Sequence, residues 1–256
     1  MKKLLLAASL AALYGTAGTA LAAPLPSGWT CTGNCGTLGP DGVVTAAAGY
    51  PDYGWVSTLG GISGNHLDLP GSDTNGSTAI SPLFAASAGD ELEFNFNFVT
   101  SDGAGYADYG WARLLDSSSS VVALLFTART TPGGNSVPGF GMPAIDATIT
   151  PATVTVVPGG PVWSPLGASS GTCYSTGCGY TGWVNATYDI LASGNYYLEF
   201  GAANWLDTAY QTGMAFAGST IAGVPIDNGT IPEPASLALL GIGLAGLGAM
   251  RRKQRA

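Results

Sequence analysis

A strict alternation of side chains between residues 92 and 99 places the strongest constraint on the fold of this chain. Every second residue there is apolar and the residues between are polar: Leu92, Phe94, Phe96 and Phe98 alternate with Glu93, Asn95 and Asn97. A period of two residues is that of a β-strand whose two faces lie in different environments. Leu92–Val99 is therefore predicted to be a strand with one buried face and one wet face.

Shorter segments of this kind follow at close intervals, and no stretch between the two ends has helical periodicity of useful length. The chain also contains 39 glycines and 16 prolines, which favour turns. These features predict an all-β fold, an antiparallel β-sandwich. The other predicted strands are an edge strand near Trp29 and the segments 43–47, 55–59, 78–84, 111–115, 121–129, 148–150, 153–157, 183–191, 196–200 and 214–221.

A seven-residue segment occurs twice in the chain, as GYPDYGW at residues 49–55 and as GYADYGW at residues 105–111. Tyrosine and tryptophan rings stack on the C–H faces of sugars, and aspartate accepts hydrogen bonds from hydroxyls. The repeat is thus a candidate carbohydrate-binding platform, with Tyr53, Trp55, Asp108, Tyr109 and Trp111 as its ligand-binding residues. The alternative is structural: both copies enter equivalent strands, with the aromatic residues in the core and aspartate in a turn or bulge.

Acidic loops suggest a second kind of ligand. Asp102, Asp108 and Asp207 are candidates for holding Ca²⁺ through carboxylate oxygens. No spacing of the EF-hand type is present, so this expectation is weaker than the aromatic one. No other cofactor is expected.

The four cysteines form two close pairs, Cys31 with Cys35 and Cys173 with Cys178. An even number in an exported chain favours disulfides. Three connectivities are possible, and the local one needs no assumption about the fold. Zinc ligation by these thiols is not expected, because the spacings are not C-x₂-C and the single histidine is far away in sequence.

Candidates for catalysis are few. Residues 167–171 read GASSG and match the G-x-S-x-G pattern around Ser169, but the pattern needs a strand before it and a helix after it. Pro165 precedes it and the cysteine loop follows it. His66 is the single imidazole available as a base for a hydrolase. We expect no catalytic residues and a protein that is not an enzyme, with a hydrolase as the least favoured alternative.

The N-terminus has the three parts of a signal peptide. Lys2 and Lys3 are its positive region, residues 4–13 are apolar, and Ala20-Leu21-Ala22 fits a small-x-small cleavage site. Cleavage is predicted after Ala22, which makes residues 1–22 a signal peptide.

The C-terminus also has three parts, and these run from residue 231 to residue 256. Pro232-Glu233-Pro234 is an extended linker, residues 235–250 form a predicted transmembrane helix without a charge, and a basic cluster follows that contains Arg251, Arg252 and Lys253. At about 1.5 Å per residue the helix is about 24 Å long, short for a hydrocarbon core of about 30 Å. A simple C-terminal membrane anchor is the alternative interpretation.

This tail resembles the sorting tail of PEP-CTERM proteins. The resemblance implies export, recognition by an exosortase-type membrane protease, removal of the tail and release of a membrane-anchored precursor to the cell surface. It also implies an association with bacteria that make extracellular polysaccharide. The body, residues 23–230, is loosely similar to the jelly-roll sandwiches of exported bacterial proteins in its strands at residues 88–98 and 194–200.

The charge of the body excludes one class of partner. The chain has 16 acidic residues and 8 lysines and arginines. Glu233 lies in the tail and the cations of the body are Arg113 and Arg129, so the net charge of the body is near −13, counted as 2 minus 15. A basic nucleic-acid-binding surface is therefore excluded. We expect a non-enzymatic surface or extracellular-matrix protein linked to polysaccharide, and alternatively a carbohydrate-binding module.

Overall fold

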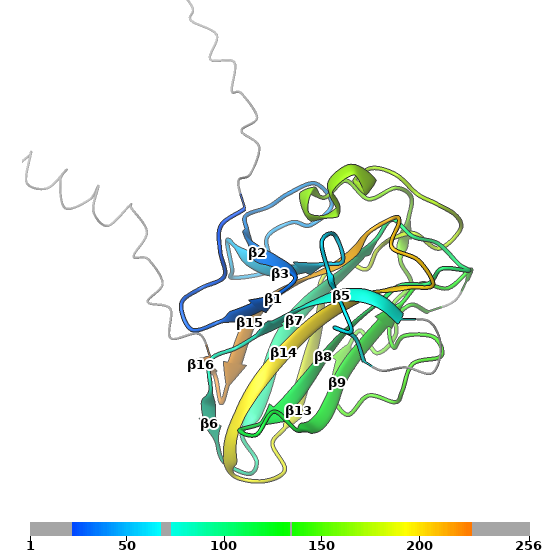
Figure 1. The fold of residues 1–256 in the computed structure, drawn as a ribbon. Coiled ribbons are helices and arrows are strands. Elements are labelled where there is room, and N and C mark those ends of the chain that lie inside the picture. The colour runs from blue at the N-terminus through cyan, green and yellow to red at the C-terminus, as the bar shows by residue number, and fades with distance from the viewer. Residues whose placement is uncertain (1–21, 68–72, 134, 227–256) are drawn as a thin grey trace, which may run out of the picture.

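The computed structural model of the chain describes residues 22–67, 73–133 and 135–226, which fold into two antiparallel sheets (Figure 1). The strands are β1 (Thr30–Thr32), β2 (Asn34–Leu38), β3 (Tyr53–Ser57), β4 (Ile62–Ser63), β5 (Asp73–Ile80), β6 (Phe84–Ala86), β7 (Glu91–Thr100), β8 (Tyr109–Asp116), β9 (Val121–Arg129), β10 (Thr148–Thr150), β11 (Val157–Pro158), β12 (Gly179–Tyr180), β13 (Val184–Asp189), β14 (Gly194–Trp205), β15 (Thr212–Ile221) and β16 (Val224–Pro225). A 3-10 helix, η1, covers Ser164–Ser169. The prediction of an all-β antiparallel sandwich is confirmed for the described residues.

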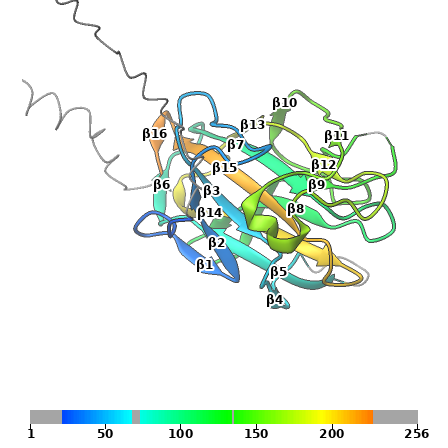
Figure 2. The ribbon, with the colours of Figure 1, turned by 90° about the horizontal axis from the view of Figure 1, so that it is seen from above.

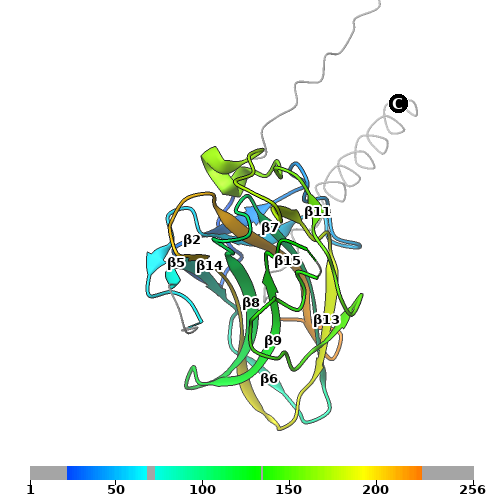
Figure 3. The same ribbon diagram turned by 90° about the vertical axis from the view of Figure 1, so that its right-hand side faces the viewer.

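The order of the strands is that of a jelly roll. One sheet contains β10-β13-β7-β15-β3-β2 and the other contains β1-β5-β14-β8-β9. The eight principal strands are β3, β5, β7, β8, β9, β13, β14 and β15. The first and last of these, β3 and β15, lie side by side, and so do the second and seventh, β5 and β14. Figure 3 shows β8 and β9 in front of β7 and β15, so that the two sheets overlap face to face. Figure 2 shows the same sandwich from above.

The core between the sheets is built on the alternation that the sequence shows. Phe94, Phe96 and Phe98 of β7 are fully buried between the sheets, and Phe96 stacks on Phe126 of β9 with ring centroids 3.7 Å apart. The opposite face of β7 is less wet than predicted, because Asn97 is buried at 1% exposure. Other segments of the chain pack on that outer face. The alternation therefore predicted the strand, but it did not predict that the outer face of the strand is covered.

Two smaller apolar clusters lie on the outer faces of the sheets. The first surrounds Tyr53 and Trp55 on β3 and is covered by Val44, Trp163 and Leu166 from two loops. The second surrounds Tyr109 and Trp111 on β8 and is flanked by Leu67, Met142 and Trp205. Each sheet therefore buries part of both its faces, which suits a chain with few charges.

Most predicted strands exist, two predictions need correction, and a further strand was not predicted. Residues 43–47 form isolated bridges instead of a strand, with Asp41 paired to Val44 and Ala47 paired to Tyr50. Of residues 153–157, Val154 makes one bridge to Val137, and β11 starts at Val157. The sequence also failed to predict β2, whose glycine and asparagine content gives no strand signal.

Both targeting segments fall largely outside the residues that the structure describes. The predicted signal peptide, 1–22, is described at its last residue alone, and the tail with Pro232, Glu233, Pro234, Arg251, Arg252 and Lys253 lies beyond residue 226. Among the described residues, no helix is long and apolar enough to cross a membrane.

Candidate functional site

The aromatic residues of the repeated segment lie in the interior. Tyr53 and Trp55 are 2% and 5% exposed, and Tyr109 and Trp111 are completely buried. The two copies enter β3 and β8, which belong to opposite sheets. These four side chains therefore form no exposed platform, and the alternative of aromatic residues in the core describes them correctly.

Each copy of Tyr-Gly-Trp packs in the same way, which explains the repeat. The tyrosine and tryptophan point to the outer face of their sheet, and the glycine points inward against a phenylalanine of the core. A Cβ at Gly54 would lie 2.4 Å from Phe216, and one at Gly110 would lie 3.2 Å from Phe98. A larger residue at position 54 would collide with a core ring, whereas at position 110 the contact with Phe98 is tight but needs only a small shift of the ring.

The tryptophan of each copy covers a glycine on the neighbouring strand. Trp55 pairs with Gly36 of β2, and Trp111 pairs with Gly201 of β14. A Cβ at Gly36 would come within 2.9 Å of the Trp55 indole, and one at Gly201 within 2.1 Å of the Trp111 indole. The repeat is thus a packing unit in which an indole fills the space above a cross-strand glycine.

Tyr53, Tyr109 and Trp111 have hydrogen-bond partners that fix their positions, whereas the Trp55 indole N–H is buried without one. The Trp163 indole N–H donates to the Tyr53 hydroxyl at 3.0 Å. The Trp111 indole N–H donates to Glu199 at 2.9 Å, and the Arg113 guanidinium donates to the same carboxylate at 2.5 Å. Arg113 is thereby committed to a cross-strand ion pair.

Exposed aromatic side chains gather instead at one end of the sandwich, which we call the loop end. It consists of residues 101–108, 172–178 and 206–211, which connect or follow strands at the end opposite β6 and β16 (Figure 1). Each segment contributes one tyrosine. The Tyr174 ring lies 5.4 Å from that of Tyr106 and 5.1 Å from that of Tyr210, and Tyr174 and Tyr210 are 47% and 37% exposed. We call these three residues the tyrosine cluster.

Backbone contacts hold the three segments of the loop end together. The Tyr174 N–H donates to the Ser101 carbonyl at 3.0 Å, and the Ala104 N–H donates to the Thr176 carbonyl at 2.8 Å. The Ser101 N–H donates to the Gln211 carbonyl at 3.1 Å. The Cys173–Cys178 disulfide closes the segment that carries Tyr174. The rings of the tyrosine cluster are thus attached to fixed backbone.

Both local disulfides are present, Cys31 with Cys35 and Cys173 with Cys178. The connectivity that required no assumption about the fold is confirmed. The four sulfur atoms are therefore not available as zinc ligands.

A hollow of about 250 Å³ adjoins the tyrosine cluster. Residues 104, 105 and 107, which flank Tyr106, form part of its lining together with Arg129, Phe140 and Trp205. The Arg129 guanidinium lies 4.3 Å above the Trp205 ring and donates to the Ala107 carbonyl at 2.9 Å. The hollow is therefore lined by two aromatic rings, by small residues and by one cation held in place.

Two buried carboxyl groups lie beneath the tyrosine cluster. Asp102 and Asp108 are 1% and 0% exposed. Burial raises the pKa of Asp102 to about 7, although the Gly103 N–H opposes the shift. Burial raises the pKa of Asp108 well above its usual range, and the charge of Asp102 adds to this, whereas the Thr212 hydroxyl and the Trp205 N–H oppose it. Asp108, predicted to contact a ligand at the surface, is thus an interior residue.

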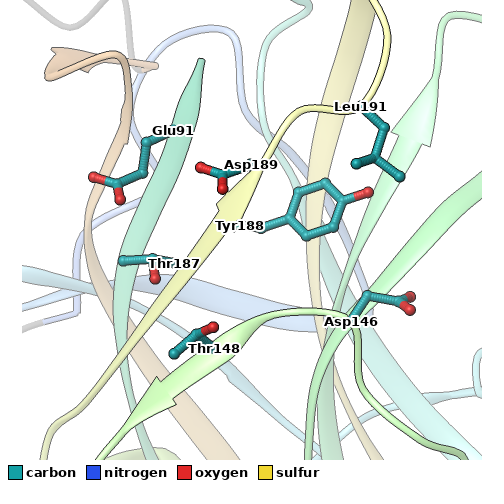
Figure 4. A pocket seen from close by; sticks show the side chains of 7 residues that line it. All are labelled: Glu91, Asp146, Thr148, Thr187, Tyr188, Asp189 and Leu191. Carbon is teal, nitrogen blue, oxygen red and sulfur yellow. The ribbon is translucent and has the colours of Figure 1, made fainter. Parts of the chain in front are cut away.

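A second hollow, of about 270 Å³, is acidic and open (Figure 4). Glu91 and Asp189 face each other across β7 and β13 as register partners, with Tyr188 and Thr148 nearby. Figure 4 shows the Asp146 carboxylate directed away from these two, and it accepts the Leu124 N–H at 2.9 Å. The carboxylates do not converge on one point, so this hollow is a poor candidate for paired-carboxylate catalysis.

The residues considered for a hydrolase occupy ordinary structural positions. Ser169 ends the 3-10 helix η1, and its hydroxyl accepts the Gln211 N–H at 3.2 Å. His66 Nδ1 lies 3.4 Å from Asp73. The strand–turn–helix context that a nucleophilic serine needs is not what surrounds Ser169.

Sequence reasoning missed the tyrosine cluster. Tyr106 lies within the second copy of the repeat, next to the residues that the repeat indicated as ligand-binding. Tyr174 lies between the paired cysteines, and Tyr210 lies in a polar loop. A helpful signal was the close cysteine pair around Tyr174, because a disulfide between these cysteines restricts the short loop that carries the tyrosine.

The fold makes this protein a β-sandwich of jelly-roll order. Residues 230–253 match the PEP-CTERM protein-sorting motif, as the tail predicts. The motif implies an exported protein that is processed at a membrane, and it is associated with exosortase processing. No curated protein matches the chain.

Several solved structures show remote likeness to the body. The K1 cleaved adhesin domain of Lys-gingipain from Porphyromonas gingivalis W83 is 14% identical over 80% of this chain and 98% of that chain, with a TM-score of 0.36. The arabinose-bound MgGH51 α-L-arabinofuranosidase is 11% identical over 76% of this chain, with a TM-score of 0.34. This chain covers 23% of that enzyme's length. At such scores the likeness carries no argument about activity.

Proposed function

We propose that this chain is a non-enzymatic protein of the cell surface or extracellular matrix that binds extracellular polysaccharide through the tyrosine cluster. The observation that carries the proposal is the convergence of three tyrosines from separate loops on one patch, where Tyr174 and Tyr210 are exposed and Tyr106 is half-buried. The repeated segments, which the sequence favoured for this role, serve packing instead.

The chemistry of the patch suits sugar rings. A tyrosine ring offers a flat apolar face for the C–H groups of a sugar, and its hydroxyl exchanges hydrogen bonds with sugar hydroxyls. Tyrosine also has two side-chain torsions, so ordering it on binding costs little entropy. The adjoining hollow adds the Trp205 and Phe140 rings, which extends the contact surface for a second sugar unit.

The charge of the body favours a neutral polymer over an acidic one. Both cations of the body are already engaged, Arg113 by Glu199 and Arg129 by Trp205 and the Ala107 carbonyl. The body carries many more carboxylates than cations, and this excess of negative charge repels a polyanion. A neutral or weakly charged polysaccharide is therefore the proposed ligand.

The position of the tail presents the tyrosine cluster away from the point of attachment. The described chain ends at Ile226, whose N–H donates to Ser219 near β16, whereas the tyrosine cluster lies beyond the far end of β7. The ten residues of β7 span about 30 Å at roughly 3.3 Å each. While the precursor is attached through its tail, the loop end faces outward in this proposal.

The proposed route to the surface uses both ends of the chain. Residues 1–22 direct export and are removed, and residues 231–256 hold the precursor in the membrane. An exosortase-type protease then removes the tail at Pro232-Glu233-Pro234 and releases the body, residues 23–230. The sorting motif supports this sequence of steps.

The test is retention of the exported protein on the extracellular polysaccharide of the cells that produce it. Replacing Tyr174 by Ala removes the central ring of the cluster, and we expect binding to weaken about five- to tenfold, from about 1–1.4 kcal/mol of lost aromatic contact. Tyr50→Ala is the matched control, since Tyr50 is 38% exposed but lies before β3.

Equal retention of the wild-type protein, Tyr174→Ala and Tyr50→Ala would contradict the proposed binding surface. Release of new reducing ends from the polymer, lost in Ser169→Ala or His66→Ala, would instead support the hydrolase alternative.

A further inference from the structure

Three oxygen atoms at the base of the loop end are buried and have no hydrogen-bond partner. They are Oδ2 of Asp102, Oδ2 of Asp108 and Oδ1 of Asn204, and these residues are 1%, 0% and 0% exposed. An acceptor that is buried without a donor destabilises a fold, and an ionised one does so most. Buried polar atoms normally have a hydrogen-bond donor, a water molecule or an ion as partner, so these three oxygens indicate a bound group.

Hydrogen bonds connect the segments that carry these three residues. The Trp205 N–H, one residue after Asn204, donates to Asp108 Oδ1 at 2.8 Å. The Asp102 N–H donates to the Thr100 hydroxyl, which lies 2.6 Å from the Thr212 hydroxyl across the β7–β15 pair. The carboxylates of Asp102 and Asp108 are close enough to repel each other. The base of the loop end thus joins β7, β8 and β14.

The cationic side chains of the body are engaged elsewhere, and so is the amide N–H₂ of Asn204. The Asn204 amide N–H₂ donates to Asn75 Oδ1 at 2.8 Å. This bond fixes the Asn204 side chain with its own Oδ1 directed away from Asn75. Arg113 and Arg129 are held by Glu199 and by Trp205 with Ala107, respectively. The chain has no lysine between residues 4 and 252. What is missing at this place is therefore a positive charge.

We propose that Asp102, Asp108 and Asn204 bind a Ca²⁺ ion that fastens the loop between β7 and β8 to the end of β14. Two carboxylate oxygens and an amide oxygen are ligands for a hard cation, and Ca²⁺ accepts an irregular set of six to eight oxygens that includes backbone carbonyls and water. Within the described ranges no three His, Cys, Asp or Glu side chains form a metal-binding group, so neutral oxygens complete the shell. Zinc, which prefers nitrogen and sulfur, does not fit.

The experiment uses the exported protein after treatment with chelator and dialysis, with CaCl₂ as the probe. Calorimetric titration is expected to show one saturable site per chain. At a hundredfold excess over Kd, the thermal midpoint of unfolding should rise by about 5–10 °C, and equal MgCl₂ should raise it less. Binding is measured without polysaccharide, so that the Ca²⁺ site is tested independently of the proposed saccharide binding.

The variants Asp108→Asn and Asp102→Asn sharpen the test. Each removes one buried charge, so in chelator each should unfold at or above the wild-type midpoint, whereas Ca²⁺ should no longer raise it. A merely structural aspartate would lower the midpoint in both conditions. Asp189→Asn, in the acidic hollow of Figure 4, is the matched control and should keep the full Ca²⁺ response.

Two results would overturn the proposal. An unchanged midpoint and no heat of binding with CaCl₂ would mean that no Ca²⁺ binds and that protonation alone neutralises Asp102 and Asp108. A Ca²⁺ response that persists in Asp108→Asn and Asp102→Asn but disappears in Asp189→Asn would move the ion to the acidic hollow.

Discussion

At the scale of single residues, this sandwich is organised by close contacts between indoles and glycines. Trp55 covers Gly36 and Trp111 covers Gly201, in each case across a pair of neighbouring strands. The Trp111 indole is also fixed by its hydrogen bond to Glu199. It therefore has little freedom to move when the space below it is filled.

The first prediction follows from that contact. In Gly201→Ala the new Cβ would lie 2.1 Å from the Trp111 ring, so the indole must shift and strain its bond to Glu199. We expect a loss of about 2–3 kcal/mol in the free energy of unfolding, typical of an overpacked core. Urea denaturation of the exported protein measures it.

Gly133→Ala is the matched control for this substitution. Gly133 is exposed, and a Cβ there would meet nothing within 4 Å. Its free energy of unfolding should stay within about 0.5 kcal/mol of wild type. Equal destabilisation by both substitutions would show that the contact between Trp111 and Gly201 is not tight.

At the scale of elements, the loops determine which surfaces are covered and which are exposed. The segment around Trp163 covers the outer face of β3 and β15, and the segment 172–178 docks on residues 101–104. Gly103 permits this docking, because a Cβ there would lie 2.6 Å from Ser175. The two disulfides lie in different places: Cys31–Cys35 joins β1 and β2, and Cys173–Cys178 closes the loop that carries Tyr174.

The second prediction compares these two disulfides. Replacing either pair of cysteines by serine should lower the free energy of unfolding by about 2 kcal/mol, the loop-closure value for so few residues. Loss of Cys173–Cys178 should also weaken retention on polysaccharide, because Tyr174 is no longer held in the cluster. Loss of Cys31–Cys35 should leave retention unchanged when both variants are assayed well below their midpoints.

A result in which both double variants lose retention equally would assign the effect to global stability. Unchanged retention in both would mean that ordering of Tyr174 by the disulfide is not needed for binding.

At the scale of the whole molecule, the end of the described chain and the tyrosine cluster lie at opposite ends of the sandwich. The described chain ends beside β16, and the tyrosine cluster lies at the opposite end of the principal strands. The sorting motif follows after the body, at residues 230–253. Export and processing thus involve one end of the molecule, and the proposed saccharide and Ca²⁺ sites lie at the other.

The third prediction concerns the sorting motif. Replacing Pro232, Glu233 and Pro234 by alanine removes the rigid linker, so the protein should stay at full length in the membrane fraction instead of reaching the surface. Cell fractionation with antibody against the body measures both length and location. Gln254→Ala, outside the matched residues 230–253, should be processed normally. Normal release of the alanine variant would show that recognition does not depend on Pro-Glu-Pro.

Much of this protein follows from its sequence because the relevant signals are local. The alternation at residues 92–99 predicts β7, since side chains of a strand point to opposite faces in turn. The spacing of the cysteines favours the disulfides that form, because four or five residues bring two thiols together in any fold. The Pro-Glu-Pro, apolar and basic segments of the tail predict the sorting motif, since they lie next to one another in the chain.

Tertiary structure alone decided which side chains reach solvent. Alternation shows that Tyr109 and Trp111 share a face, but the segments that cover this face come from residues 67 and 142, which no local pattern connects to β8. The tyrosine cluster and the three unpartnered oxygens likewise join loops far apart in sequence. A strand's period determines which residues lie together, whereas burial depends on what the rest of the chain places over them.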